Sequence, residues 1–401
     1  GLQLTNTHPL AGHGNNIVFG LNGDFGHAKF SQYAQPAQFT ATRGADAIGD
    51  YELETAANTT DRTLAAYAMD TFKATPDVAV TVAGRYNDAT TTIRDTSGTA
   101  PDLDGSHAFR RFTPGVGVAW NPRTDLTAYT SYNEGMRAPT AVELTCADPQ
   151  APCKLPNSFV SDPALKAVVA HTFEVGARGK AAGWNWSAAA YRTRSDDDIQ
   201  FVASGNSVNA GYFRNVGTTR RQGAELSLSG PVGPLQLTVR YSYTDATYVD
   251  GFVENSPNNS SADGDGNITV NPGSRIPSIP RNSLRVRLDA DVRPDWQVGA
   301  NVLYNSASYA RGDENDQAAG GVVPAYAILD LDTVWTVRKG LQLFARANNV
   351  FDRHYSNFGI LAENDFANAA RTFDPDNARS ETFFGQGAPF GFWAGVRLQW
   401  D

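Results

Sequence analysis

The chain has 401 residues, of which 41% are hydrophobic and 19% charged, and its formal net charge at pH 7 is -9. A negative net charge argues against nucleic acid as a partner, because phosphate backbones attract basic surfaces. No segment approaches the roughly 20 consecutive apolar residues that a membrane-spanning helix needs, so a helical membrane protein is excluded.

The beginning of the chain shows no export signal. It starts with Gly1 rather than methionine, and it lacks the basic start and apolar core of a signal peptide. We therefore expect that residues precede Gly1 in the native protein. Acidic residues gather farther along the chain in polar stretches such as 263–265 and 312–316, which we interpret as solvated loops.

Apolar and polar side chains alternate along many segments, and this period of two predicts strands. In residues 284–292, for example, Leu284, Val286 and Leu288 fall on one face, while arginine and aspartate fall on the other. Many segments reach about ten residues, which exceeds the usual length in soluble sheets and suits a tilted bilayer crossing. About 15 such strands are predicted, beginning near residues 2, 16, 62, 78, 108, 125, 168, 184, 212, 235, 282, 296, 324, 341 and 389.

The connections between these strands alternate between short and long. The short ones are tight turns at residues 75–77, 121–125, 180–183, 229–234, 293–295 and 338–340. The long ones cover about residues 31–61, 93–107, 137–167, 250–281, 311–323 and 353–388. This asymmetry is typical of an outer-membrane β-barrel, which has short periplasmic turns and long extracellular loops.

Tryptophan positions support this topology, because the indole ring favours the membrane interface. Most tryptophans border the short turns: Trp120, Trp184, Trp186, Trp296 and Trp335, with Trp400 at the same inferred level. Only Trp393 falls outside this belt. A soluble sandwich gives no reason for tryptophan to prefer one end of the strands, so the sequence favours the membrane barrel.

Both cysteines, Cys146 and Cys153, lie in one proline-rich loop. This spacing predicts a local disulfide in an oxidising compartment rather than a zinc site, because no histidine is close in sequence. Free thiols are the remaining alternative.

Catalytic chemistry is not indicated. The six histidines have no metal-ligand spacing, and no G-x-S-x-G motif is present. We therefore predict no catalytic residue and no cofactor. Asp263, Asp265 and Asn267 resemble the start of a calcium loop, but the closing glutamate is missing, so a flexible acidic loop is the favoured interpretation.

Aromatic side chains are frequent in the long loops. They are Phe252, Tyr309, Tyr355, Phe358, Phe366, Phe373, Phe383 and Phe384. Such rings stack on ligands in some proteins, but interface anchoring and loop packing are at least as common uses. No ligand-binding residue is assigned on this basis.

Several segments resemble, in order and spacing, the TonB-dependent receptor family. They are residues 66–72 followed by 80–86, residues 131–144, residues 162–166 leading into 173–178, residues 215–217 leading into 222–228, and residues 347–355 before a terminal strand that closes on an aromatic. The resemblance covers nearly the whole chain. Asp401 after Trp400 departs from it, because the family usually ends on the aromatic itself.

The resemblance implies a 22-stranded transmembrane antiparallel β-barrel, occluded by an amino-terminal plug and coupled to the inner-membrane TonB complex through a short box. Residues 1–401 then form a partial barrel domain, in which the plug, the box and roughly the first seven strands are absent. With fewer strands, we expect a curved sheet or an incompletely closed barrel.

The expected function is uptake of a scarce nutrient across the outer membrane of a Gram-negative bacterium. A ferric siderophore is the default ligand within the family, and cobalamin, haem, other metal chelates and oligosaccharides remain open. The implied surroundings are outer-membrane lipid and lipopolysaccharide, and the implied state is a monomer. A passive porin-like channel is the alternative, and an outer-membrane enzyme is disfavoured.

Charged residues on the polar face have a structural explanation. We expect Arg85, Glu174, Arg178, Glu225 and Arg240 to point into the lumen as a charge-paired wall, with direct ligand contact as the alternative. A second set, Gly84, Gly176 and Gly223, is expected to relieve crowding where strands bend.

Overall fold

The computed structural model describes residues 1–40, 43–98, 100–147, 153–154, 165–203 and 210–400. Within this part of the chain nearly all regular structure is β, with one short α-helix and two 3₁₀ helices. No described helix has the length and hydropathy to span a membrane.

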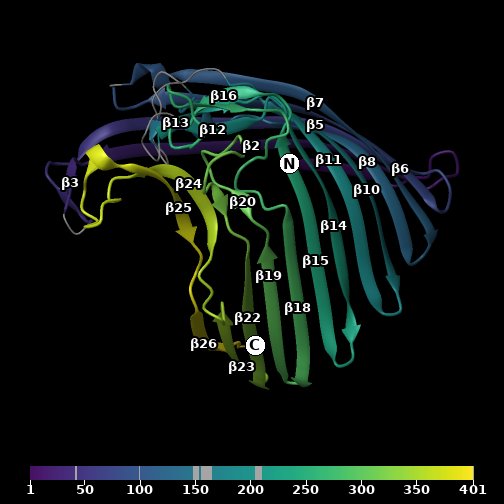
Figure 1. The fold of residues 1–401 in the computed structure, drawn as a ribbon. Helices are drawn as coiled ribbons and strands as arrows, with labels where there is room; N and C mark the ends of the chain where they lie inside the picture. The colour runs from purple at the N-terminus through teal and green to yellow at the C-terminus, as the bar shows by residue number, and fades with distance from the viewer. Residues whose placement is uncertain (41–42, 99, 148–152, 155–164, 204–209, 401) are drawn as a thin grey trace.

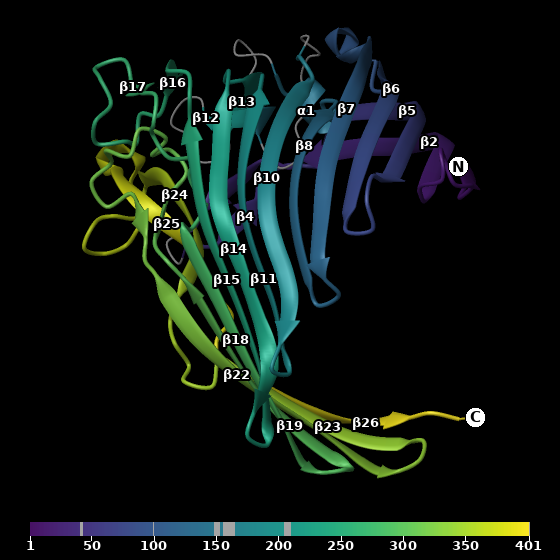
Figure 2. The same ribbon diagram turned by 90° about the vertical axis from the view of Figure 1, so that its right-hand side faces the viewer.

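Fifteen strands form one antiparallel sheet in which each strand pairs with the next along the chain. They are β1 (Leu2–Asn6), β2 (Asn15–Ala34), β5 (Glu52–Lys73), β6 (Val78–Asp95), β7 (Gly105–Arg123), β8 (Leu126–Arg137), β10 (Val168–Ala181), β11 (Trp184–Asp196), β14 (Thr219–Val232), β15 (Leu235–Tyr248), β18 (Asn282–Arg293), β19 (Trp296–Asn305), β22 (Tyr326–Arg338), β23 (Leu341–Asn348) and β26 (Gly391–Leu398). The sheet curves strongly around an open interior (Figures 1 and 2), as expected for part of a barrel wall.

The predicted strand starts agree with this sheet at all but two positions. The strand expected near residue 62 begins at Glu52, because β5 continues to pair with β2 as far as Ala34. The strand expected near residue 212 begins at Thr219, because residues 210–215 form β13 in a separate small sheet. Much of the predicted loop at 31–61 is therefore strand, and the connection between β11 and β14 is a long one.

The long connections carry small sheets and short helices of their own, and they lie at the end of the wall opposite the tight turns (Figure 2). The small strands are β3 (Ala37–Phe39), β4 (Ala45–Ala47), β9 (Cys153–Lys154), β12 (Ile199–Ala203), β13 (Ala210–Asn215), β16 (Phe252–Asn255), β17 (Asn267–Val270), β20 (Ser308–Tyr309), β21 (Val322–Val323), β24 (Ser356–Asn364) and β25 (Arg379–Gln386). The helices are η1 (Pro101–Leu103), α1 (Ala141–Leu144) and η2 (Pro375–Asn377).

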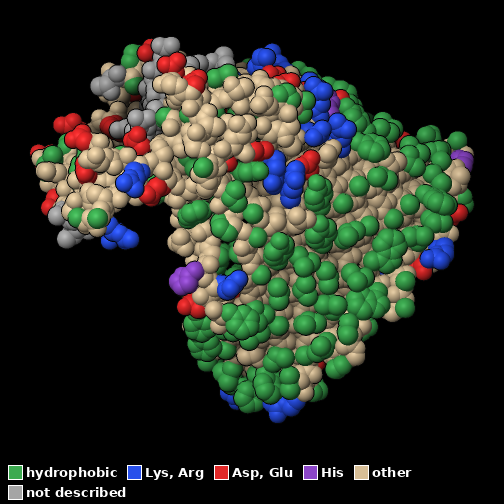
Figure 3. Space-filling view, viewed as in Figure 1, with side chains coloured by type: hydrophobic (Ala, Val, Ile, Leu, Met, Phe, Trp, Pro, Cys, Tyr) green, Lys and Arg blue, Asp and Glu red, His purple; other side chains and the backbone are tan. Residues whose placement is uncertain are grey.

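The two faces of the large sheet differ in polarity, as the alternation predicts. Large apolar side chains are exposed on one face, among them Phe112, Phe173, Leu226 and Phe392. Figure 3 shows apolar side chains over much of the right-hand and lower part of the molecule, with many charged groups toward the loop end. We call these two sides of the sheet the apolar face and the polar face. Trp393, the exception to the belt, is on the polar face, where Arg346 lies 5.8 Å from its ring centroid.

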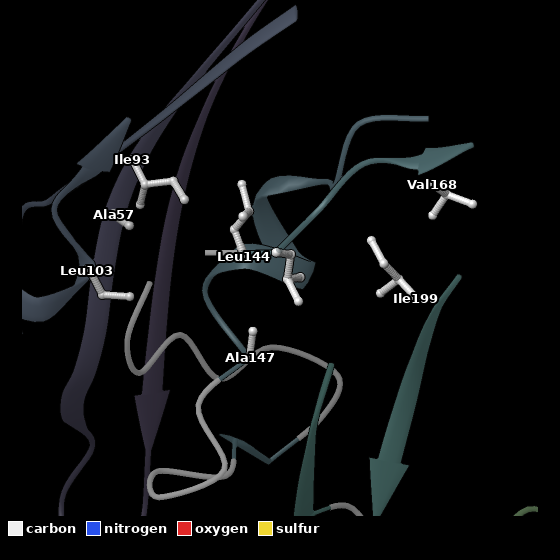
Figure 4. Packing of buried hydrophobic residues seen from close by; sticks show 8 residues of the cluster. Ala57, Ile93, Leu103, Leu144, Ala147, Val168 and Ile199 are labelled. Atoms are coloured by element: carbon white, nitrogen blue, oxygen red, sulfur yellow. The ribbon is translucent and has the colours of Figure 1, made fainter. Parts of the chain in front are cut away.

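Buried hydrophobic clusters lie among the long loops and the loop ends of the strands. The first contains Ala57, Ile93, Leu103, Leu144, Ala147, Leu165, Val168 and Ile199 (Figure 4). The second contains Val216, Ala246, Tyr248, Ile268, Val270 and Ile276. Burial of a large aliphatic side chain contributes roughly 1.5–3 kcal/mol, so these clusters hold the loops in defined positions over one end of the wall.

Candidate functional site

A cavity of about 740 Å³ opens on the polar face, between β8 and β19. Three of the residues expected to point into the lumen, Glu174, Glu225 and Arg240, all line it. Tyr129 donates a hydrogen bond from its hydroxyl to Oε1 of Glu174 over 2.6 Å. The cavity therefore presents carboxylate, guanidinium and phenol groups on one surface, which suits a polar ligand or a polar protein segment.

The two other predicted lumen residues lie elsewhere on the wall. Arg85 donates through Nε to Asn87 over 2.7 Å and lies over the ring of Tyr67. Arg178 lines a smaller cavity of about 390 Å³ near the short turns. The five residues therefore do not form one site.

A second polar cluster, which sequence reasoning missed, lies near the loop end of β8 and β10. Arg111 donates to Glu134 over 2.7 Å, and the hydroxyl of Tyr132 donates to the same carboxylate over 2.9 Å. The His171 ring lies between two further partners. Its Nδ1 is 3.0 Å from the Tyr132 hydroxyl, and its Nε2 is 3.4 Å from a carboxylate oxygen of Asp196. Tyr132 and Glu134 are neighbours on β8, but Arg111, His171 and Asp196 are distant in sequence, and the register of the sheet brings them to this pair.

A third cluster lies toward the turn end. Arg287 donates to Asp289 over 2.8 Å and to both carboxylate oxygens of Asp332. All three side chains are on the polar face, where opposite charges compensate each other. These three residues are not among the five expected to form the charge-paired wall, and the charge pairing of those five stays a prediction.

The acidic stretch at 312–316 is buried, which corrects its interpretation as a solvated loop. Asp313 has no exposed surface, and its Oδ1 accepts hydrogen bonds from the backbone N–H groups of Gln317 and Ala318, each over 2.8 Å. The Oδ2 atom is buried and has no hydrogen-bond partner among the described residues. Asn259, from the preceding long loop, donates to the carbonyl oxygen of Gly312 over 2.9 Å. Contacts between two distant loops therefore bury this stretch.

Burial raises the pKa of Asp313 to about 6. Burial likewise raises the pKa of Glu254 well above its ordinary value, and repulsion from the Glu314 carboxylate adds to this effect. The pKa of Asp316 is also raised by burial, although Arg275 partly opposes the shift. Several protons are thus held more tightly in the packed loops than in an opened state.

The packing of these loops is expected to weaken as the pH rises. A raised folded-state pKa contributes stability that is complete below the unfolded value of about 3.9 and is lost as the pH rises through about 6. The shift of Asp313 alone corresponds to roughly 100-fold in the opening equilibrium at most. Hydrogen exchange of residues 311–323, corrected for intrinsic rates, should therefore be faster at pH 7.5 than at pH 4.5.

Two substitutions test the origin of that dependence. Asp313→Asn should flatten it, because the amide does not titrate. Asp376→Asn, at an exposed position in η2, should leave it unchanged. Equal pH dependence in Asp313→Asn and in the unmodified protein would contradict the assignment.

The weak calcium candidate is an internally closed turn. Oδ1 of Asp263 accepts the backbone N–H groups of Asp265 and Asn267 over 3.0 and 2.9 Å. In the part of the chain that the structure describes, no group of three or more His, Cys, Asp or Glu side chains is arranged to hold a metal ion. Calcium binding at Asp263, Asp265 and Asn267 stays a prediction that the sequence disfavours.

The disulfide between Cys146 and Cys153 also stays a prediction. Cys146 is buried, with an exposed fraction of 1%, and it lies in sequence between Leu144 and Ala147 of the first hydrophobic cluster. The backbone of Cys153 pairs with Gly211 of β13, but its side chain lies outside the described part of the chain.

Several predicted loop aromatics pack on other aromatic rings. Phe366 and Phe373, with centroids 5.7 Å apart, both contact Phe39 of β3. Phe252 contacts Tyr248 with a centroid distance of 5.1 Å. These contacts supply the loop-packing explanation for the aromatic residues.

A family model described as "TonB dependent receptor-like, beta-barrel" matches residues 2–350. The probable TonB-dependent siderophore receptor PiuA of Acinetobacter baumannii is 23% identical over 249 residues, which are 60% of this chain and 30% of that protein. The ferric-pyoverdine receptor PbuA of a Pseudomonas strain is 27% identical over 284 residues, which are 65% of this chain and 28% of that protein.

Solved structures show the same architecture. The ferric-catecholate import receptor Fiu of Escherichia coli superposes with a TM-score of 0.67 at 16% identity. The superposition covers 99% of this chain and 53% of that receptor. The chain therefore spans about half the length of the structure it matches.

Proposed function

This chain belongs to the TonB-dependent receptor-like β-barrel family, and we propose that the protein takes up a scarce nutrient, most favourably a ferric siderophore, with energy from the TonB complex. The family places the chain in the outer membrane, with the apolar face against lipid, the tight turns in the periplasm and the long loops outside the cell. The plug and the TonB box belong, in this proposal, to another part of the same polypeptide, and residues 1–401 form part of its barrel.

The observation that carries the proposal is a polar wall covered at its extracellular end by ordered loops. The cavity at Glu174, Glu225 and Arg240 offers polar contacts inside the wall, and the buried loop clusters hold a structured entrance above it. The names of two relatives, PiuA and PbuA, refer to a siderophore and to ferric pyoverdine. The passive channel is distinguished from this proposal by the lack of a plug and of energy coupling, because long extracellular loops occur in outer-membrane barrels generally.

The proposal extends to partners and to chemistry. We propose a monomer surrounded by outer-membrane lipid and lipopolysaccharide, with a small iron chelate as ligand and with the TonB complex engaged from the periplasm. We also propose that the protein is a transporter rather than a catalyst, because family and relatives are receptors.

The proposal predicts that deletion of the gene abolishes uptake of a radiolabelled ferric siderophore in iron-limited cells. Restoration of the full-length gene should restore uptake, and collapse of the proton-motive force should stop it within the same cells. Uptake that continues after the collapse would identify a passive channel. Normal iron uptake in the deletion strain, together with loss of cobalamin, haem or oligosaccharide uptake, would reassign the ligand.

The domain assignment has a separate test. Intact mass of the native product from outer membranes should be well above the 43.1 kDa of this chain, because a plug and further strands are expected in the same polypeptide. A native mass near that value would contradict the assignment.

A further inference from the structure

An apolar groove of about 460 Å³ crosses the apolar face near the periplasmic turns. Its floor consists of small side chains, chiefly Ala290, Ala300, Ala345 and Ala347. Larger side chains stand around them, among them Leu235, Leu288, Leu331 and Phe392. The register sets the lining residues in two adjacent rows. One row runs through Leu288, Ala300, Leu331, Ala347 and Phe392, and the other runs through Leu235, Ala290, Val298, Thr333 and Ala345.

The groove is long enough for a lipid chain. It extends from β15 to β26 across neighbouring strands that are each about 4.8 Å apart, which gives a length of roughly 24 Å. One leaflet of a bilayer contributes only about 15 Å of hydrocarbon depth. An acyl chain lying in the groove would therefore contact the protein along most of its length.

A cation stands at the periplasmic border of the groove. The guanidinium of Arg293 lies 5.7 Å from the ring centroid of Trp296 and 5.6 Å from that of Trp335. Among the described residues, Arg293 is the only arginine positioned over two tryptophan rings. Its side chain is 54% exposed, and its ion pair with Asp295 is long at 3.5 Å. The guanidinium thus lies over two indoles and beside the Asp295 carboxylate, with more than half of the side chain exposed.

The tryptophan pair connects this arginine to the groove. Trp296 pairs with Trp335 in the register, and Trp335 is the next residue after Thr333 on the same face of β22. Trp296 donates from Nε1 to Oγ1 of Thr333 over 2.8 Å, and Thr333 lines the groove. The cation and the apolar channel therefore adjoin each other at the level where indoles meet the membrane interface.

We propose that Arg293 and this groove form a binding site for one glycerophospholipid of the periplasmic leaflet. The phosphate of the headgroup binds Arg293, whose planar fork suits phosphate oxygens, and one acyl chain lies over the alanine floor. Small side chains leave a channel in a face that the family places against lipid, and a lipid chain is the apolar group available there. The arginine distinguishes a specific site from general solvation of the apolar face.

Native mass spectrometry of the full-length receptor tests this site. The receptor, purified from outer membranes in a mild detergent, is titrated with phosphatidylglycerol and separately with phosphatidylethanolamine. In each titration, the first lipid molecule that binds should do so at least about tenfold more tightly than the molecules that bind after it, which corresponds to about 1.4 kcal/mol. Equal affinity of the first and later lipids would overturn the proposal.

Variants separate the headgroup contact from the channel. Arg293→Gln should weaken the binding of the first phospholipid molecule about tenfold. Ala300→Phe should remove the tight binding site, because the larger ring fills the groove. Arg123→Gln is the matched control, because Arg123 pairs with Asp125 over 3.0 Å in another periplasmic turn. It should bind the first lipid as the unmodified receptor does.

Other outcomes of the same experiment oppose the proposal. Equal effects of Arg293→Gln and Arg123→Gln would mean that only general charge matters. Tight retention of lipopolysaccharide in place of the phospholipid, or dimers that disappear in Ala300→Phe, would assign the groove to a different occupant. Heat-modifiable electrophoretic mobility confirms that each variant is folded before the titration, so loss of binding cannot arise from misfolding. The result does not depend on which nutrient the receptor transports.

Discussion

Substitution of Gly223 by alanine is expected to prevent most of the receptor from assembling. Gly223 lies in β14, between its partners Tyr191 in β11 and Thr244 in β15. A Cβ atom at this position would collide with the backbone carbonyl oxygen of Tyr243 and would lie 3.0 Å from the hydroxyl of Tyr191. The backbone of β15 would have to move, and such overpacking costs about 1–3 kcal/mol or more.

The amount of folded receptor in outer membranes, measured by heat-modifiable mobility, checks this expectation. Gly135→Ala is the matched control, because a Cβ at Gly135 in β8 meets no atom within 4 Å. If both variants assemble equally well, the close approach at Gly223 is not a constraint on the wall. At the other predicted glycines the nearest atoms belong to side chains and not to the backbone. A Cβ at Gly84 would lie 2.6 Å from the ring of Phe112, and a Cβ at Gly176 would lie 2.6 Å from the ring of Tyr129.

Truncation of Leu144 to alanine is expected to open the loops around α1. Leu144 is fully buried in the first cluster, and a change from leucine to alanine in such a place costs about 2–5 kcal/mol. The helix that carries it is short and depends on its capping box, in which Thr140 and Glu143 bind each other's backbone N–H. Arg137 holds the same glutamate through contacts of 3.0 and 2.7 Å. Without the Leu144 side chain, these polar contacts alone must hold the helix in place.

Hydrogen exchange of residues 141–147 should accelerate strongly in Leu144→Ala, while exchange in the transmembrane strands should stay the same. Val142→Ala provides the control, because Val142 lies in the same helix with 38% of its surface exposed. Similar exchange in the two variants would show that the cluster does not hold the loops. Faster exchange in the strands as well would show that loops and wall open together.

The wall was predictable from sequence because its side chains meet two different solvents. Alternation is enforced wherever lipid lies on one side and a polar interior on the other, and β15, β18 and β26 follow it closely. The start of β5 was missed because residues 52–61 extend the ladder beyond the alternating region, where threonine and alanine replace the regular pattern. The segment at 210–215 has strand-like residues, but it pairs with β12 and β9 instead of joining the wall.

The sites were less predictable, because their members meet only after folding. Glu174, Glu225 and Arg240 were identified by their polar parity, which is a local signal. The burial of Asp313 depends on Asn259 and on other residues of a different loop, and no local pattern distinguishes it from the exposed Asp265. The contact of Arg293 with two tryptophans likewise requires the pairing of β18, β19 and β22.

The buried hydrophobic clusters lie among the long loops and the loop ends of the wall strands. The chain therefore has two sources of stability, which are the burial of apolar side chains away from water at the loop end and the hydrogen bonding of the strands within the bilayer. A mutation in either cluster therefore acts on the loops and on the loop ends of the strands, while the hydrogen-bonded ladders below them keep their own support.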